Sequence, residues 1–373
     1  MLRLEPRPER SRLLLWTTPL LAAGMTVVSA YVLFLTIGVD PLKALGHVIL
    51  DPFASGYARS ELLVKAAPLA LIALGLSLGF RANVWNIGAE GQFTLGAICG
   101  GAVALTFYGV EGLWLFPLIC AGGIAGGMAW AAIPAILRTR MGVNEILVSL
   151  MLTYIAVLLL SALVSGPLRD PDGFNFPESR IFHDSAIPPM LIEGTRAHIG
   201  IAIVPVVALF LWWMTRYHEI GFSLRLLGDT PRAARFAGFS ETRAIWFCLM
   251  VSGGLAGLAG ALEATGPIGQ LVPGIPVGYG FTAIIVAFLG RLHPIGVVFA
   301  ALALAVSYIG GESAQIAMSL PAALVGVLQG TLLFWLLIFD LFVGYRVRRV
   351  RSPKAETRAD ARPVPRLSDA GGA

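Results

Sequence analysis

Long apolar runs, separated by charged or glycine-rich positions, fill most of this chain of 373 residues. Most runs are continuous for 17 residues or more and do not alternate apolar with polar positions, which is typical of membrane helices and not of membrane strands. Segment 279–290 is too short to cross a hydrocarbon core of ~30 Å at about 1.5 Å per residue, so we expect a broken or tilted element there. The pattern predicts ten helical segments: 13–38, 62–80, 84–108, 113–137, 144–166, 199–215, 244–266, 279–290, 294–309 and 321–341.

The composition places these segments in a lipid bilayer. Hydrophobic residues make up 57% of the chain and charged residues only 13%, whereas a soluble protein carries about 25% charged residues. Ten spans of about 20 residues would use nearly all of the hydrophobic residues, which leaves no room for a large soluble domain. The sequence therefore predicts an all-α polytopic membrane protein with about ten transmembrane helices.

Lysine and arginine are distributed unequally between the predicted loops. With ten spans, 21 of the 27 basic residues fall on the side of the chain ends and 6 on the opposite side. Cytoplasmic loops carry the excess of Lys and Arg, so both termini are predicted to be cytoplasmic. The predicted regions are an N-terminal tail 1–12, a transmembrane domain 13–341 with a cytoplasmic loop 216–243 and an extracytoplasmic loop 167–198, and a basic, disordered cytoplasmic tail 342–373.

Nothing in the sequence indicates an enzyme. The three lysines, Lys43, Lys65 and Lys354, are each followed by alanine, so no Walker A loop for nucleotide phosphates is present. The five histidines have no metal-ligand spacing, no GxSxG nucleophile motif occurs, and the three cysteines fall inside apolar runs. We therefore expect no catalytic residue, no metal and no cofactor on this chain, and if ATP drives the protein, another subunit binds it.

Pairs of glycines at four-residue spacing recur along the predicted helices. In lipid such pairs let helix backbones approach closely, so they predict a compact bundle. The pairs are Gly96 with Gly100, Gly122 with Gly126, Gly123 with Gly127, Gly253 with Gly257, and Gly326 with Gly330.

A polar cluster interrupts the start of the third predicted span. A carboxylate at the centre of a span costs about 2.5–3.5 kcal/mol on insertion scales, so Glu90, about six residues and ~9 Å into this segment, is expected to face the bundle interior. Three hypotheses stay open: a structural turn whose amides satisfy backbone groups freed by Gly88 and Gly91, direct substrate contact, or gating. The candidates for a substrate pathway are Asn83, Trp85, Asn86, Glu90, Gln92, Asn144 and Glu145.

Two further carboxylates lie at predicted helix ends. Glu145 falls in the first turn of the fifth span, where a negative charge is favoured by the helix dipole. Glu263 closes the seventh span and precedes a Gly/Pro segment, 265–276, which cannot be regular helix. This segment would form an outer gate, with Glu263 and Gln270 as candidate residues, or only a loop.

The loop 216–243 contains the signals of a two-turn helix. Asp229 or Thr230 suits the N-cap, Pro231 suits the first helical position, and Gly238 suits a left-handed stop. Its surface mixes basic residues with Phe236 and alanines, which suits docking into a protein groove, the alternative being a helix that rests on lipid.

At these residues the sequence resembles the permease subunits of bacterial ABC importers for nucleosides and simple sugars, relatives of the branched-chain amino acid and ribose permeases. With the loop helix, the similar blocks cover roughly residues 60–341. They are FRANVWNIGAEGQ at 80–92, GVNEI at 142–146 with MLTYI at 151–155, and GYGFTAIIVAFLGRLHPIG at 278–296.

The resemblance implies a permease built from inverted repeats in the bacterial inner membrane. The pathway would lie within this bundle or at its interface with a second, homologous permease subunit, and a substrate-binding protein would dock on loop 167–198 and on the segment after Glu263. The helix Asp229–Phe239 would be the coupling helix, seated on a cytoplasmic ABC ATPase that binds ATP. Membrane lipid would surround the subunit, and no nucleic acid is expected. The coupling residues would be Asp229, Thr230, Pro231, Arg232, Arg235, Phe236 and Gly238.

Two functional hypotheses follow. In the first, the chain is an ABC permease subunit that moves nucleosides or related simple sugars inward by alternating access. In the second, it is a self-sufficient secondary transporter that uses Glu90 as a proton or cation site.

Overall fold

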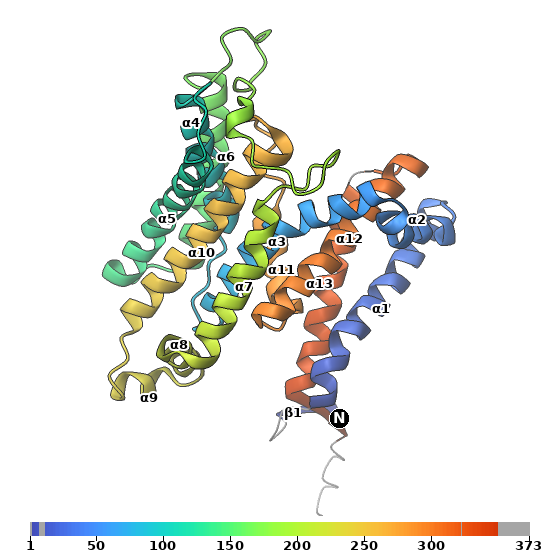
Figure 1. Cartoon of the computed structure of the whole chain (residues 1–373). Coiled ribbons are helices and arrows are strands. Elements are labelled where there is room, and N and C mark those ends of the chain that lie inside the picture. The colour runs from blue at the N-terminus through green and yellow to red at the C-terminus, as the bar shows by residue number, and fades with distance from the viewer. Residues whose placement is uncertain (1, 7–11, 322, 350–373) are drawn as a thin grey trace, which may run out of the picture.

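The computed structural model describes residues 2–6, 12–321 and 323–349, and nearly all of their regular structure is helical (Figure 1). The α-helices are α1 (Arg12–Ile37), α2 (Pro41–Ala54), α3 (Gly56–Arg81), α4 (Ala89–Thr106), α5 (Leu115–Met141), α6 (Glu145–Ser165), α7 (Gly200–Tyr217), α8 (Glu219–Asp229), α9 (Pro231–Phe236), α10 (Glu241–Glu263), α11 (Tyr279–Leu289), α12 (Pro294–Met318) and α13 (Ala323–Gly344). A 3₁₀ turn, η1 (Asp184–Ala186), a π-helical turn, η2 (Ala264–Ile268), and two strands, β1 (Leu2–Pro6) and β2 (Tyr345–Arg349), complete the regular elements.

Each of the ten predicted segments contains one helix, and the prediction of an all-α polytopic membrane protein is confirmed. Among the described residues, eight helices are long and apolar enough to cross a membrane: α1, α3, α5, α6, α7, α10, α12 and α13. The other two segments hold α4, which has Glu90 and Gln92 near its start, and α11. With 11 residues, α11 is about 16 Å long, so the short element expected at 279–290 is confirmed.

α3 forms the centre of the bundle. Its most apolar stretch is 89% buried, against 17% for α1 and α13. Because α3 is apolar around its whole circumference, every side of it can pack on protein, and it lies against α7, α10, α11 and α12.

α4, α5 and α10 pack at backbone distance, as the glycine pairs predict for this part of the chain. A Cβ atom on Gly96 would lie 2.1 Å from the carbonyl oxygen of Gly257, and one on Gly123 would lie 2.8 Å from the same oxygen. The pair Gly326 and Gly330 is different, because no described atom lies within 4 Å of the Cβ position of either residue. That pair does not mark a helix contact within this subunit.

The first and the last described segments of the chain lie together. β1 pairs with β2 in an antiparallel ladder that sets Leu2 opposite Arg349, and α1 and α13 pack side by side (Figure 1). The prediction of disorder from residue 342 onward is therefore wrong for 342–349, because α13 continues to Gly344 and a distant segment supplies the hydrogen bonds of β2. The rest of the predicted tail, 350–373, and positions 1 and 7–11 of the N-terminal tail lie outside the described residues.

Two helices are additional to the predicted segments. α2 begins at a local signal, since Asp40 accepts hydrogen bonds from the backbone N–H groups of Leu42 and Lys43 and Pro41 occupies the first helical position. α8 connects α7 to α9 and is capped by His218, whose side chain accepts a hydrogen bond from the Ile220 N–H.

Candidate functional site

The bundle has two distinct ends. One carries α8 and α9 and is called the α9 end; the other carries residues 167–198 and is called the loop end (Figure 1). Arg81, the last residue of α3, donates from Nε and Nη2 to the carbonyl oxygen of Leu292, at 3.0 and 2.5 Å. This contact sets the end of α11 level with the α9 end of α3. Since α11 is only about 16 Å long, it begins about halfway across the bundle.

The segment 82–88, between α3 and α4, is not helical. In its second half, backbone N–H groups are bonded to side chains instead: Trp85 N–H donates to Glu145 Oε1 (3.3 Å), and Ile87 N–H donates to Ser149 Oγ (3.3 Å). The helix therefore begins at Ala89, and the expectation of a helix from position 84, with Glu90 six residues into it, is wrong. Glu90 lies in the first turn of α4.

The Glu90 carboxylate caps the start of α11. Its Oε1 accepts a hydrogen bond from the Gly278 N–H (2.7 Å) and its Oε2 accepts one from the Gly280 N–H (2.5 Å). Glu90 is only 2% exposed, and a Cβ on Gly280 would lie 2.2 Å from the Glu90 nitrogen, so the two backbones touch. A carboxylate at the N-terminus of a helix satisfies N–H groups that have no intrahelical partner and is favoured by the dipole.

Asn86 and Gln92 form an amide network with Ser252 of α10. Asn86 Nδ2 donates to Gln92 Oε1 (2.7 Å) and to Ser252 Oγ (2.9 Å), and Gln92 Nε2 donates back to Asn86 Oδ1 (3.1 Å). The same Asn86 oxygen accepts a hydrogen bond from the Gly88 N–H (3.1 Å). At Gly91 there is no room for a side chain, because a Cβ atom would lie 2.8 Å from Thr153 Cα. The geometry matches the structural-turn hypothesis for these two amides.

Asn144 and Glu145 begin α6 at the α9 end. Asn144 is the cap, since its Oδ1 accepts from the Ile146 N–H (2.9 Å). Glu145 has specific partners beyond the helix dipole, because it pairs with Arg138 at the end of α5 and accepts from the Trp85 N–H. Asn83 is exposed, adopts a left-handed φ of 56°, and accepts a hydrogen bond from Trp85 Nε1 (2.9 Å).

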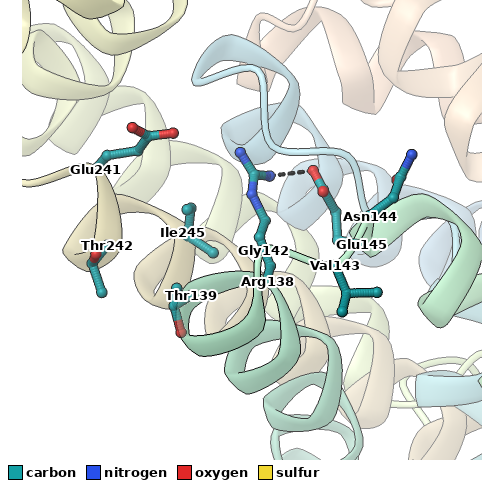
Figure 2. Close-up of a pocket in the computed structure, with 9 residues that line it drawn as sticks. All are labelled: Arg138, Thr139, Gly142, Val143, Asn144, Glu145, Glu241, Thr242 and Ile245. Carbon is teal, nitrogen blue, oxygen red and sulfur yellow. Dashed lines mark hydrogen bonds and ion pairs between the residues drawn. The ribbon is translucent and has the colours of Figure 1, made fainter.

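A pocket of about 430 Å³ opens beside this ion pair at the α9 end. Figure 2 shows Arg138 directed toward Glu145, with Glu241 and Thr242 on the opposite wall. Glu241 is the first residue of α10 and pairs with Arg235 of α9 (2.8 Å). The pocket therefore lies between the start of α10, the helix that follows α9, and the junction of α5 with α6.

α9 has the length and ends that its local signals predict. It runs from Pro231 to Phe236, and Gly238 adopts the left-handed φ of 86° expected at a helix stop. Thr230 occupies the N-cap position without a side-chain capping bond, and Asp229 is the last residue of α8. Phe236 is 94% exposed.

At the loop end, segment 167–198 and the Gly/Pro segment after α10 are joined by hydrogen bonds. Ser179 N–H donates to the Leu271 carbonyl (2.9 Å), the Leu271 N–H donates back to Ser179 Oγ (2.8 Å), and Gln270 Nε2 donates to Glu178 Oε2 (3.1 Å). Glu263 accepts a long hydrogen bond from the Tyr279 hydroxyl (3.4 Å). The candidate gate residues therefore lie at different places, Gln270 on the loop surface and Glu263 beside the start of α11.

Sequence reasoning missed a second polar group, which is called the α11 polar cluster. Lys65 Nζ lies 3.4 Å from Glu312 Oε1 and over the Tyr279 ring, and the Tyr308 hydroxyl lies 3.0 Å from Thr282 Oγ1. Single polar residues within apolar runs are its only sequence signal, and each is unremarkable alone. The cluster comprises Lys65, Tyr279, Thr282, Tyr308, Glu312 and Gln329.

Comparison with known proteins identifies the family. Residues 58–337 match the family described as branched-chain amino acid transport system / permease component. The chain is 36% identical to the glucose ABC transporter permease protein TsgB13 of Haloferax volcanii, over 97% of this chain and 99% of that protein. It is 31% identical to the guanosine ABC transporter permease protein NupP of Bacillus subtilis (83% and 89% covered) and 25% identical to the nucleoside ABC transporter permease protein NupB of Lactococcus lactis (86% and 90% covered). The chain belongs to the branched-chain amino acid transport system permease family and is a membrane-spanning permease subunit of an ABC importer.

Proposed function

We propose that this subunit moves nucleosides or related simple sugars inward by alternating access, while a separate subunit hydrolyses ATP. The observation that carries the proposal is the family match over residues 58–337, together with relatives named for guanosine, nucleosides and glucose. The absence of a Walker A lysine from the sequence agrees with an ATPase on another chain.

The ATPase would bind at α9, with the α9 end in the cytoplasm. The concentration of basic residues in the loops on that side supports this orientation, in which both termini would be cytoplasmic and the membrane would be the bacterial inner membrane. Phe236 is exposed and Arg235 is held by Glu241, so an apolar side chain protrudes from a helix whose position is braced. A protruding aromatic residue of this kind suits a groove in a partner protein.

The substrate-binding protein would dock at the loop end. Segment 167–198 and the Gly/Pro segment are held together by Ser179, Glu178 and Gln270, which supports a single docking surface made of both. Since Tyr279 begins α11 and contacts Glu263 at the end of α10, movement of this surface would reach the start of α11.

A second permease subunit would complete the transporter. The Bacillus subtilis relative NupP has a companion in the same organism, the guanosine ABC transporter permease protein NupQ, which is 30% identical to this chain over 64% of its length. This pairing supports a heterodimer of homologous permeases.

Reconstitution tests the proposal against the ion-coupled alternative. The complete transporter, with its ATPase, second permease and binding protein, is expected to accumulate tritiated guanosine or labelled glucose in liposomes only when ATP is present. Uptake by the purified chain alone, driven by a pH gradient, would overturn the proposal and favour Glu90 as an ion site. Against that alternative, both Glu90 oxygens already accept backbone hydrogen bonds.

A further inference from the structure

The α11 polar cluster brings uncharged hydrogen-bonding groups from three helices to one place. Thr282 of α11 lies 3.0 Å from the Tyr308 hydroxyl of α12 and donates a long hydrogen bond to Gln329 Oε1 of α13 (3.4 Å). Tyr279 packs edge-on against Tyr308 with ring centroids 5.9 Å apart. Three polar groups and an aromatic face therefore meet within one helical turn of the start of α11.

This place lies about halfway across the membrane. Thr282 is in the first turn of α11, which begins about 16 Å from the α9 end of α3, beside the Glu90 cap. Transporters commonly hold their substrate near this depth, at the broken end of a discontinuous helix.

Toward the loop end the cluster continues as an ion pair. Lys65 lies 16 residues before Arg81, about 24 Å along α3, and pairs with Glu312, which is one turn beyond Tyr308 on α12. The side chains of Lys65 and Glu312 are 22% and 47% exposed. Exposed charges within spanning helices are costly against lipid, so this face borders water or protein rather than hydrocarbon.

Gln329 carries an unused hydrogen-bonding atom. The residue is only 7% exposed, its Oε1 accepts from Thr282, and its Nε2 has no hydrogen-bond partner among the described residues. Buried polar atoms are nearly always paired in native structures, so this amide indicates a ligand group that is absent from the subunit alone.

We propose that Thr282, Tyr308 and Gln329 contact the substrate directly in the middle of the pathway, with Lys65 and Glu312 lining its part toward the loop end. This inference rests on the proposed transport function. The three contact groups are uncharged and the ion pair is compensated, which suits a neutral ligand rich in hydroxyl groups, such as a nucleoside or a sugar, and not a phosphorylated one. Lys65 and Glu312 are the partly exposed charged members of the cluster, and a second permease subunit would close the pathway on their side.

Cysteine accessibility tests the location without knowledge of the substrate. Gln329→Cys and Tyr308→Cys are made in a chain whose three native cysteines are replaced by alanine, and the complete transporter in vesicles is treated with a charged, membrane-impermeant methanethiosulfonate. We expect both positions to be modified, in the nucleotide-free or the ATP–vanadate state. The matched control is Val327→Cys, an exposed position on α13 two residues from Gln329, which we expect to resist modification. Protection of positions 308 and 329 in both states would overturn the proposal.

Substrate discrimination tests the contact itself. Gln329→Leu is expected to reduce uptake of guanosine about three- to tenfold relative to uptake of its 2′- and 3′-deoxy analogues. Guanosine would lose a hydroxyl–amide hydrogen bond in this variant, whereas an analogue without that hydroxyl has no such bond to lose. The control is Thr331→Val, because among the described residues the Thr331 hydroxyl bonds only to the Val327 carbonyl of its own helix (2.7 Å). Equal reduction for all analogues would contradict a direct contact. A wild-type transporter that takes up no nucleoside or sugar would refute the proposed substrate class, and the accessibility experiment would still decide the location.

Discussion

Replacing Glu90 tests how the start of α11 is held inside the membrane. The carboxylate accepts one hydrogen bond from Gly278 and one from Gly280, and no water can substitute for it at a position that is only 2% exposed. Leucine would leave both backbone N–H groups without an acceptor. Glutamine would keep one acceptor oxygen and turn its NH₂ group toward the other N–H.

The structure sets the expected magnitudes. An unsatisfied buried donor costs about 1–3 kcal/mol, so Glu90→Leu is expected to lower the free energy of unfolding by about 2–6 kcal/mol. Glu90→Gln orphans one donor and is expected to cost about 1–3 kcal/mol. Transport is expected to follow the same order, wild type above glutamine above leucine, because α11 would lose its fixed starting point.

Unfolding of the purified subunit by SDS in mixed micelles measures the stability change, and uptake by the complete transporter measures the functional one. Glu111, exposed in the turn between α4 and α5, is the matched control: Glu111→Gln and Glu111→Leu should leave both quantities unchanged. Wild-type stability of Glu90→Leu would refute the capping argument. Equal loss of transport in both Glu90 variants, with normal stability, would show that transport needs the charge itself.

Three further predictions concern other parts of the subunit. Phe236→Glu is expected to abolish co-purification of the ATPase without reducing membrane insertion or stability. The control is Phe174→Glu at the loop end, where Phe174 is also 94% exposed, and this variant should leave the ATPase bound. Retention of the ATPase by Phe236→Glu would contradict docking at α9. Burial lowers the pKa of His198 to about 4 from its usual 6.5. Between these pH values the unfolded chain binds one more proton than the folded chain, so the stability should fall by up to about 1.4 kcal/mol per pH unit as the pH decreases from 6.5 to 4. His198→Gln should remove this pH dependence in SDS unfolding curves. Gly257→Val is expected to prevent assembly of α5 with α10, since even a Cβ would lie 2.2 Å from the Gly123 carbonyl oxygen, and a folded yield equal to wild type after detergent extraction would disprove this packing.

The features that could be predicted from the sequence are those with local signals. The ten apolar segments depend on length and composition within about 20 residues, and α9 depends on a proline and a glycine seven positions apart. Such signals act within the segment that carries them, so tertiary contacts rarely override them.

The features that could not be predicted depend on partners far away in the chain. The sequence shows that Glu90 is a charged residue inside an apolar segment. Its hydrogen-bond partners are 188 and 190 residues later in the sequence, so nothing near Glu90 indicates that it caps α11. The Trp85 N–H is bonded to Glu145, 60 residues later, so no local signal shows that α4 begins only at Ala89. Gln329 and Thr282 form a cluster only after α11 and α13 have packed together.

The packing of α1 along α13 has a consequence for biosynthesis. Ser29 of α1 accepts a hydrogen bond from Trp335 of α13, so α1 contacts a helix that is synthesised about 306 residues later. At a translation rate of about 5–20 residues per second, α1 is in the membrane for roughly 15–60 s before α13 has been synthesised. During that interval its apolar surface is available to chaperones and to other membrane proteins, and a chain truncated before α13 would leave that surface permanently uncovered.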